Sequence, residues 1–303
     1  MDTFTPPNAV QALARYREIR ERLPAADFPK TSIHRANLAD LCNEIDCFVL
    51  DGFGVLNVGV DPVPGAVDRI NALRAQGKLL RVLTNGASFP ATRTREKYRK
   101  WGMEFDASEV ISSRDALAVA LKRHPDMRWG FAALEGSELG TLTHNAVLLQ
   151  DDAADYASCD GFVLLGVGDW SPHRQRLLAD ALKQKSRPLF VGNPDLVAPQ
   201  VGEFSMEPGW FTHSLVDELG VAAELFGKPF DNAFELVRQT LPDDLSAHRI
   251  AMVGDTLHTD ILGGAQAGWK TILITDHGLL KGANVEQEIK DSGIRPDFII
   301  PTT

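Results

Sequence analysis

Short apolar runs, each followed by a polar turn and then by a helical pattern, recur along this chain and restrict its fold. The runs lie at 47–50, 79–83, 250–253 and 271–274. Strands that are buried on both faces form nearly continuous apolar runs, and strands that alternate with helices build parallel sheets. The pattern therefore predicts an α/β fold, with a Rossmann-like parallel sheet covered by helices on both faces.

The segments between these runs have the periodicity of helices and end where helices commonly end. Helices are expected at 66–75, before Gly77, and at 92–101, before Gly102. Glycine is the preferred residue just past a helix C-terminus. A further helix should follow the run at 250–253 and end near residue 268.

A helix is also expected near the start of the chain, before the first strand. Its apolar residues recur at three- and four-residue steps, which is the helical period, and Asn8 is a suitable N-cap. These residues are Val10, Leu13, Tyr16, Ile19 and Leu23. We interpret this segment, residues 1–37, as a helical extension that packs on the protein or faces a partner.

The middle of the chain has the pattern of a second α/β unit. Strands are expected at 130–134, 146–149, 162–165 and 189–191, with a helix at 172–185. Low-complexity linkers are absent from the sequence around this unit, which favours an insertion into the first domain. The predicted domains are therefore a core of residues 38–124 and 208–303 and an inserted cap of residues 125–207.

Composition excludes several classes of protein. The chain has 31 basic and 41 acidic residues, for a net charge of −10, which disfavours binding to the phosphate backbone of nucleic acids. Its apolar runs are far shorter than the roughly 18 residues of a membrane span. The first ten residues lack the basic and apolar regions of a signal peptide. The three cysteines have no disulfide or metal-binding spacing. We therefore expect a cytoplasmic protein.

Three strands are followed by side chains suited to binding a metal and a phosphate group. Asp51, Thr84 and Asp255 each stand at the carboxyl end of an expected strand, where parallel sheets form their sites. Any one of them could be a helix cap or a turn residue, but the coincidence of three favours a site. Two adjacent carboxylates repel each other unless a cation lies between them, and oxygen ligands of this kind suit Mg²⁺.

The same turns can hold a phosphate group. The hydroxyl of Thr84 and the backbone N–H groups of Gly52, Asn85 and Gly86 are suitable donors to phosphate oxygens. Lys228 can neutralise both a phosphate and a nucleophilic carboxylate. We therefore expect a small phosphorylated metabolite as the substrate.

In these motifs the sequence resembles the haloacid dehalogenase (HAD) superfamily of aspartyl-phosphate-forming hydrolases, in its NagD-like class IIA branch. The matching motifs, in chain order, are FVLDGFGVL, VLTNGAS, GKP and VGDTLHTDILGGAQAG. The resemblance implies a large α/β cap and a Mg²⁺-dependent hydrolase with Asp51 as nucleophile, assisted by Thr84 and Lys228. It further implies that Mg²⁺ is bound by Asp51, the backbone carbonyl of Phe53, Asp255 and Asp260. Asp195, in the cap motif GNPDL, is implied as a substrate contact.

The first motif departs from the family at one position. Phosphatases of the family have a second aspartate two residues after the nucleophile, where it is the general acid and base, and this chain has Phe53. Such a group commonly contributes about 10²–10⁴-fold to the rate. His258, between Asp255 and Asp260, is a candidate replacement, although its place in a turn favours an exposed histidine.

These observations predict hydrolysis of a small phosphomonoester, such as a sugar phosphate, a nucleotide or a compound like pyridoxal phosphate. One alternative is a phosphate-binding or regulatory protein with little turnover. Another is a hydrolase of the phosphonate or haloacid type. A homo-oligomer formed through the cap or the N-terminal helix is compatible with the sequence.

Overall fold

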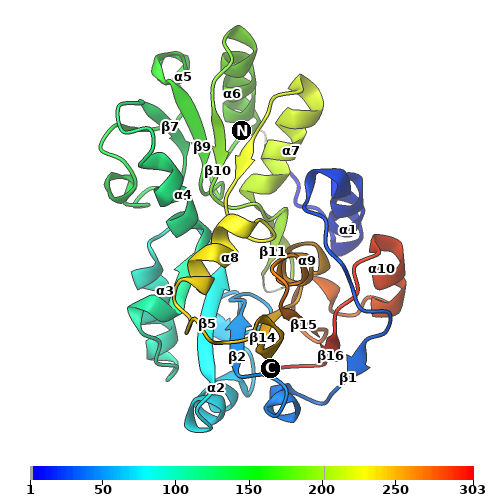
Figure 1. The fold of residues 1–303 in the computed structure, drawn as a ribbon. Coiled ribbons are helices and arrows are strands. Elements are labelled where there is room, and N and C mark those ends of the chain that lie inside the picture. Colours follow the sequence, from blue (N-terminus) through cyan, green and yellow to red (C-terminus); the bar gives the residue numbers. More distant parts are fainter. Residues whose placement is uncertain (1–2, 201) are drawn as a thin grey trace.

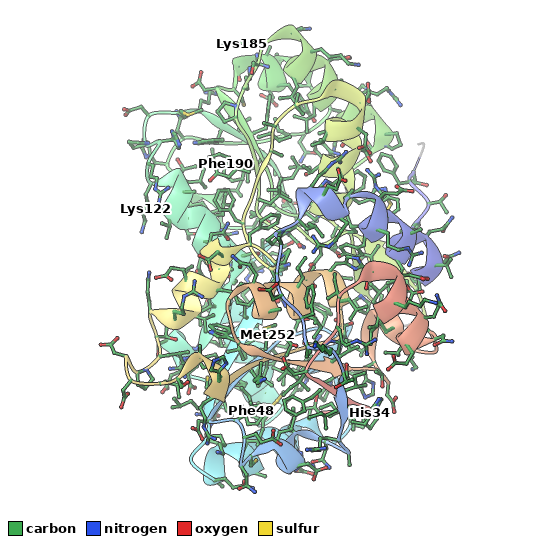
Figure 2. All side chains as sticks on the ribbon, turned by 45° about the vertical axis from the view of Figure 1, so that its right-hand side comes forward. His34, Phe48, Lys122, Lys185, Phe190 and Met252 are labelled. Carbon is green, nitrogen blue, oxygen red and sulfur yellow. The ribbon has the colours of Figure 1, made fainter. Side chains whose placement is uncertain are left out.

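The computed structural model describes residues 3–200 and 202–303, so Met1 and Asp2 of the predicted N-terminal extension and Val201 of the predicted cap lie outside it. Two parallel sheets form two lobes, one above the other in Figure 1. Figure 2 shows Phe48 and Met252 among the side chains of the lower lobe and Phe190 among those of the upper lobe. The predicted fold class and the insertion of a second α/β unit are both confirmed.

The lower lobe contains a seven-stranded sheet in the order β1-β16-β15-β14-β2-β5-β6. Its strands are β1 (Ile33–His34), β2 (Cys47–Leu50), β5 (Leu79–Thr84), β6 (Val110–Ser112), β14 (Ile250–Gly254), β15 (Lys270–Ile274) and β16 (Phe298–Ile300). All of its pairings are parallel. Each of the four predicted core strands is present within one residue of its expected bounds.

Helices cover both faces of this sheet, as the apolar runs predicted. Alternate residues of β2 enter different clusters of buried side chains, with Phe48 and Leu50 in one cluster and Cys47 and Val49 in another. The first cluster includes Tyr98 of α3 and the second includes Phe234 of α8. The helices of this lobe are α2 (Ala66–Ala75), α3 (Ala91–Lys100), α8 (Asp231–Arg238), α9 (Leu262–Gln266) and α10 (Val285–Ser292), and a small hairpin pairs β3 (Asn57–Val58) with β4 (Asp61–Pro62).

The upper lobe contains a five-stranded parallel sheet in the order β13-β10-β9-β7-β8. Its strands are β7 (Trp129–Ala132), β8 (Ala146–Leu148), β9 (Gly161–Leu164), β10 (Leu189–Val191) and β13 (Glu224–Leu225), and its helices are α4 (Ser113–Leu121), α5 (Ala153–Ser158), α6 (Pro172–Gln184) and α7 (Pro208–Leu219). A hairpin of β11 (Val197–Pro199) and β12 (Phe204–Met206) follows β10. Because α7 packs beside β10 and α6, and β13 completes this sheet, we propose that the cap extends to about residue 225 rather than to 207.

The N-terminal helix α1 (Ala9–Glu18) lies beside the junction of the two lobes (Figure 1). Its Asn8 cap is confirmed, and a short 3-10 turn at Arg20–Arg22 continues the predicted segment. Its apolar face packs on side chains of the core and of β11. Arg15 and Arg22 both pair with Asp217 of α7. The helix therefore contacts both lobes of its own chain.

Among the residues that the structure describes, helices long and apolar enough to cross a membrane are absent. The longest helix of the upper lobe, α6, carries several charged side chains along its length.

Candidate active site

Three neighbouring strands of the core sheet deliver the predicted site residues to one edge. The order β14-β2-β5 places the residues that follow β14 and β2 beside the end of β5. Asp51, Thr84 and Asp255 all line one cavity of about 480 Å³. The predicted convergence of these three strand ends is present in the structure.

Asp51 is held by a buried lysine that comes from the other half of the chain. The Oδ1 atom of Asp51 accepts hydrogen bonds from Nζ of Lys228 at 2.5 Å and from the backbone N–H of Gly52 at 2.7 Å. The same Nζ lies 2.8 Å from Oδ1 of Asp260. Lys228 therefore bridges two carboxylates, and it is only 1% exposed.

Burial and the neighbouring charges act in opposite directions on the pKa values of Asp51 and Lys228. Burial raises the pKa of Asp51 to about 7, although the ammonium of Lys228 opposes the rise. Burial alone would lower the pKa of Lys228, but the carboxylates of Asp260 and Asp51 outweigh it and hold that pKa above its ordinary value. The lysine therefore stays charged at neutral pH, and it can balance negative charge at Asp51.

Asp255 and Asp260 are oriented by the turn that follows β14. Asp255 accepts hydrogen bonds from the hydroxyl of Thr256 and from the backbone N–H of Leu279, both at 2.9 Å. Asp260 accepts one from the backbone N–H of Thr256 at 3.1 Å. Instead of the expected regular helix, residues Leu257–Ile261 form a wider π-helical turn before α9.

The glycine that follows Phe53 in the first motif is required by the close approach of Asp255. Gly54 has a φ of +80°, and a Cβ atom built on it would lie 2.5 Å from Cγ of Asp255. Any other residue would be strained in the backbone and would collide with this carboxylate. The turn after β2 therefore needs glycine in order to bring Asp255 close to the nucleophile.

The three aspartates fit a Mg²⁺ ion by the chemistry of their donors. Asp51, Asp255 and Asp260 are all buried, and each offers an oxygen within 4.8 Å of the others. Burial and the charges of Asp260 and Asp51 raise the pKa of Asp255 to about 8. Three carboxylates face one ammonium here, so a divalent cation would compensate their mutual repulsion, and hard oxygen ligands suit Mg²⁺. Phe53, whose carbonyl was predicted to contribute, lines the same cavity.

The motif at the end of β5 holds the site together. Oγ1 of Thr84 accepts a hydrogen bond from the backbone N–H of Gly86 at 3.1 Å. The side chain of Asn85 donates to the carbonyl of Lys228 and to Asp195, at 2.9 and 2.8 Å, and accepts from the backbone N–H of Lys228 at 2.7 Å. The Asn85 side chain thus fixes the lysine loop, a role that its sequence motif did not indicate. A phosphate contact by its backbone N–H stays a prediction.

Asp195, a residue of the cap, lines the same cavity. It follows β10 in the cap, and its hydrogen bond to Asn85 joins the two lobes at the site. Burial raises the pKa of Asp195 to about 7. The structure therefore brings Asp195 to the substrate cavity, and its contact with substrate stays a prediction.

His258 is buried, so the expectation of a solvent-facing histidine is wrong. Its side chain is 1% exposed and stacks on the ring of Tyr16, with 4.9 Å between ring centroids. Burial lowers the pKa of His258 to about 3. A neutral imidazole is a poor proton donor at neutral pH, and His258 is not among the described residues that line the cavity. Its burial and its position outside the cavity lining disfavour His258 as the replacement acid.

Several residues of the cavity wall were missed by sequence reasoning. Tyr16 comes from the N-terminal helix, Arg93 and Lys97 come from α3, and Glu207 comes from the cap. The spacing of Arg93 and Lys97, four residues apart in the basic stretch RTREKYRK, places them on one helix face. That spacing could have indicated a shared surface, but not which cavity it faces.

Comparison with known proteins places this geometry in a family. A model described as "Haloacid dehalogenase-like hydrolase" matches residues 48–142, and one described as HAD-hydrolase-like matches residues 225–303. The chain is 31% identical over 299 residues to a glycerol-3-phosphate phosphatase of Rattus norvegicus, an alignment that covers 89% of this chain and 92% of the relative. This chain belongs to the haloacid dehalogenase superfamily.

Other relatives agree with its class IIA, NagD-like branch. An acid sugar phosphatase of Staphylococcus aureus is 24% identical, with 83% of this chain and 92% of that protein covered. The structure of a possible sugar phosphatase of the HAD superfamily from Cytophaga hutchinsonii superposes with a TM-score of 0.77 at 26% identity, covering 90% of this chain and 98% of that one. This HAD protein is a phosphatase of phosphoric monoesters, as the sequence predicted.

Magnesium is the cofactor typical of this HAD class. A glycerol phosphate phosphatase of Mycobacterium tuberculosis with the same fold was solved in complex with magnesium, with a TM-score of 0.66 at 22% identity over 86% of this chain and 74% of that one. The cluster of Asp51, Asp255 and Asp260 supplies the carboxylate ligands that such an ion needs. The donor set of the cluster therefore fits the predicted cofactor, Mg²⁺.

Proposed function

We propose that this HAD phosphatase hydrolyses a small phosphomonoester through an aspartyl-phosphate on Asp51, with Phe53 at the position of the usual general acid. The observation that carries the proposal is the bridge of Lys228 between Asp51 and Asp260. This bridge gives the buried carboxylate of Asp51 a positive partner, and Asp51 also lines the cavity. A carboxylate in this setting is suited to nucleophilic catalysis.

The proposed reaction has two steps. An oxygen of Asp51 bonds to phosphorus as the bond from phosphorus to the leaving oxygen breaks. Thr84, Lys228 and the backbone N–H groups of the two turns stabilise the charge on the phosphoryl oxygens. Mg²⁺ held by the aspartates would add positive charge at the same oxygens. Water then attacks the acyl-phosphate, which releases phosphate and restores the Asp51 carboxylate.

The substrate is proposed to be a small phosphorylated metabolite. A cavity of about 480 Å³ suits a sugar phosphate, a nucleotide or a compound like pyridoxal phosphate. Relatives named as a glycerol-3-phosphate phosphatase and an acid sugar phosphatase support the smaller end of that range. Asp195, which reaches the cavity from the cap, is suited to contact the leaving group rather than the phosphate.

A phosphate-binding protein with little turnover is the second candidate. Phe53 favours it, because a phenyl ring donates no proton to a departing alcohol, and the buried neutral His258 does not compensate. A hydrolase of the haloacid type is less well supported, because the cluster of three aspartates favours a metal site.

The first test is hydrolysis of p-nitrophenyl phosphate with Mg²⁺ and then with EDTA. Nitrophenolate departs without needing a proton, so a phosphatase that lacks its acid should still cleave this ester. We expect turnover that depends on Mg²⁺ and stops with EDTA. Binding of phosphate without any turnover under these conditions would favour the second candidate.

Because Phe53 stands in place of the family's general acid, we expect the rate of hydrolysis to depend steeply on the leaving group. Wild type should cleave nitrophenyl phosphate much faster than an alkyl phosphate. Phe53→Asp should raise kcat/KM for alkyl phosphates by up to about 10²–10⁴-fold and kcat/KM for nitrophenyl phosphate far less, because the first step needs a proton only when an alkyl alcohol departs. Any gain from a restored base in the second step is common to both esters and would be seen in kcat. Steady-state kinetics on both esters measures the difference.

The matched control for this gain is Phe53→Asn, because asparagine has a shape similar to that of aspartate but no acidic proton. It should leave the rate on alkyl phosphates near that of wild type. Equal gains for Phe53→Asp and Phe53→Asn would contradict an acid role at this position. Wild type that already cleaves alkyl phosphates as fast as nitrophenyl phosphate would show that another residue supplies the proton.

A reducing, cytoplasmic location and a homo-oligomer are proposed as well. The three cysteines are free, which supports a reducing compartment. The apolar face of α1 packs within its own chain, so an oligomer through the cap is better supported than one through that helix. Light scattering on the purified protein measures its oligomeric state.

A further inference from the structure

One cation of the cavity wall has neutral partners. Lys97 lies on α3, is half-buried and lines the same cavity as Asp51. Its Nζ donates a hydrogen bond to Oδ1 of Asn57 at 3.0 Å. Three aromatic rings surround it, with their centroids 5.1–5.3 Å from Nζ: Phe53, Tyr98 and Trp101.

This ammonium lacks the counter-charge that the other buried lysine has. Lys228 lies within 2.8 Å of two carboxylates, whereas no carboxylate of the described residues lies within 4.0 Å of Nζ of Lys97. Withdrawing a charge from water is costly unless the charge is paired. Burial accordingly lowers the pKa of Lys97 to about 8, against the opposing effect of Asp51. A bound anion would supply the missing partner.

Other charged groups of the wall already have partners. Arg93, one turn before Lys97, pairs with Glu138 of the cap at 2.8 Å and stacks on Phe89. Among the acids, Asp195 is bound by Asn85, and Glu207 is bound by Asn193 and Ser205. Of the cations on this wall, Lys97 is therefore the one that fits an anionic group from the ligand.

The position of Lys97 separates it from the phosphoryl group. Lys228 contacts Asp51 itself, whereas Lys97 contacts Phe53 and Asn57, which follow the nucleophile in the chain. Phe53 has the position that the resemblance to the family assigns to the general acid, which would act on the leaving oxygen. The ammonium beside this ring therefore lies on the side of the leaving group.

We propose that Lys97 binds a second anionic group carried by the leaving group, so that the preferred substrates are phosphomonoesters of acidic alcohols. The second group is a carboxylate or another phosphate. This inference rests on the proposed function, since it takes the phosphoryl group to lie at Asp51. It narrows the substrate class beyond a small phosphomonoester.

Non-hydrolysable phosphonates test this preference without turnover. Phosphonoacetate and methylphosphonate differ by one carboxylate, as do 3-phosphonopropionate and ethylphosphonate. With Mg²⁺ present, calorimetry should show that wild type binds the carboxylated member of at least one pair about 10–100-fold more tightly, as expected for a hydrogen bond to a charged group. Methylenediphosphonate, compared with methylphosphonate, measures the preference for a second phosphate.

Variants assign the preference to this side chain. Lys97→Met should abolish the preference and leave methylphosphonate affinity within about 3-fold, and Lys97→Arg should keep part of the preference. Lys100→Met, at an exposed position three residues further along the same helix, is the matched control and should behave as wild type. Circular dichroism checks that each variant is folded.

Three results would overturn the proposal. The first is wild type that binds both members of every pair equally. The second is a loss of affinity in Lys97→Met that is the same for plain and carboxylated ligands, since Lys97 would then act on the phosphoryl group. The third is wild type that binds none of the phosphonates, which would overturn the proposed function as well. In the first two results methylphosphonate still binds, so the proposed function stands.

Discussion

Replacing Asp51 with asparagine is expected to lower the turnover of p-nitrophenyl phosphate by about 10⁴-fold or more, an effect of the order found when a catalytic nucleophile is removed. An amide is a poor nucleophile, and its neutral side chain no longer pairs with Lys228, which contacts Asp51 at 2.5 Å. The residual charge of Asp260 still faces the lysine at 2.8 Å, so the fold should be preserved. Single-turnover kinetics measures the loss.

The matched control is Asp180→Asn, on the exposed surface of α6, which should leave turnover unchanged. Beryllofluoride, which mimics an acyl-phosphate on a carboxylate, should add to Asp51 when crystals are soaked with Mg²⁺. Density for beryllofluoride on another residue would contradict the proposed nucleophile. So would substantial turnover in Asp51→Asn after deamidation has been excluded by mass spectrometry.

The sequence was most informative where local pattern and topology agree. The runs that became β2, β5 and β14 are buried on both faces, so their apolar character is a direct consequence of the sheet. Parallel strands end at one edge, and for that reason Asp51, Thr84 and Asp255 were predictable as a group. Their convergence needed no knowledge of the loops between them.

Other features depend on contacts between distant segments. His258 looked like a turn residue, but the π-helical turn buries it under Tyr16, which is 242 residues earlier in the chain. Lys97 looked like one basic residue among several on a helix surface, and only packing beside Phe53 turns it toward the cavity. Contacts of this kind produce no local pattern in the sequence from which they could be predicted.

The proposed later end of the cap has a related reason. Helix α7 and the two-residue strand β13 follow the predicted boundary at 207, and they complete the cap sheet rather than the core. A strand of two residues is too short to show periodicity, so its sheet is decided by its pairing with Phe190 and Val191. The extended boundary near residue 225 is consistent with that pairing.

Replacing Asp255 with asparagine should abolish the response to Mg²⁺ and should stabilise the metal-free protein at pH 8. The pKa of Asp255 is raised to about 8, largely by burial, from 3.8. Between these values the folded state binds more protons than the unfolded state, so the free energy of unfolding falls as the pH rises. Metal-free wild type should therefore lose thermal stability from pH 5 to pH 8, and Asp255→Asn should lose less.

Magnesium should reverse this loss of stability in wild type but not in Asp255→Asn. Binding only the folded state stabilises it by about 2.7 kcal/mol at a ligand concentration 100 times the Kd. Because the ion needs ionised carboxylates, its affinity should increase as the pH rises toward 8. Thermal melts with Mg²⁺ or EDTA at several pH values measure both effects. In Asp255→Asn the melting temperature should be the same with Mg²⁺ and with EDTA, and turnover should fall by about 10³-fold or more.

A variant at another buried acid separates the effect of Mg²⁺ binding on stability from the effect of burying an acid. Glu207 also has its pKa raised to about 7 by burial, but it lies outside the cluster of three aspartates. Glu207→Gln should therefore gain stability at pH 8 without losing the response to Mg²⁺. If Asp255→Asn kept the full Mg²⁺-induced rise in melting temperature, Asp255 would not be a ligand. The raised pKa of Asp255 would then reflect burial and the neighbouring carboxylates alone.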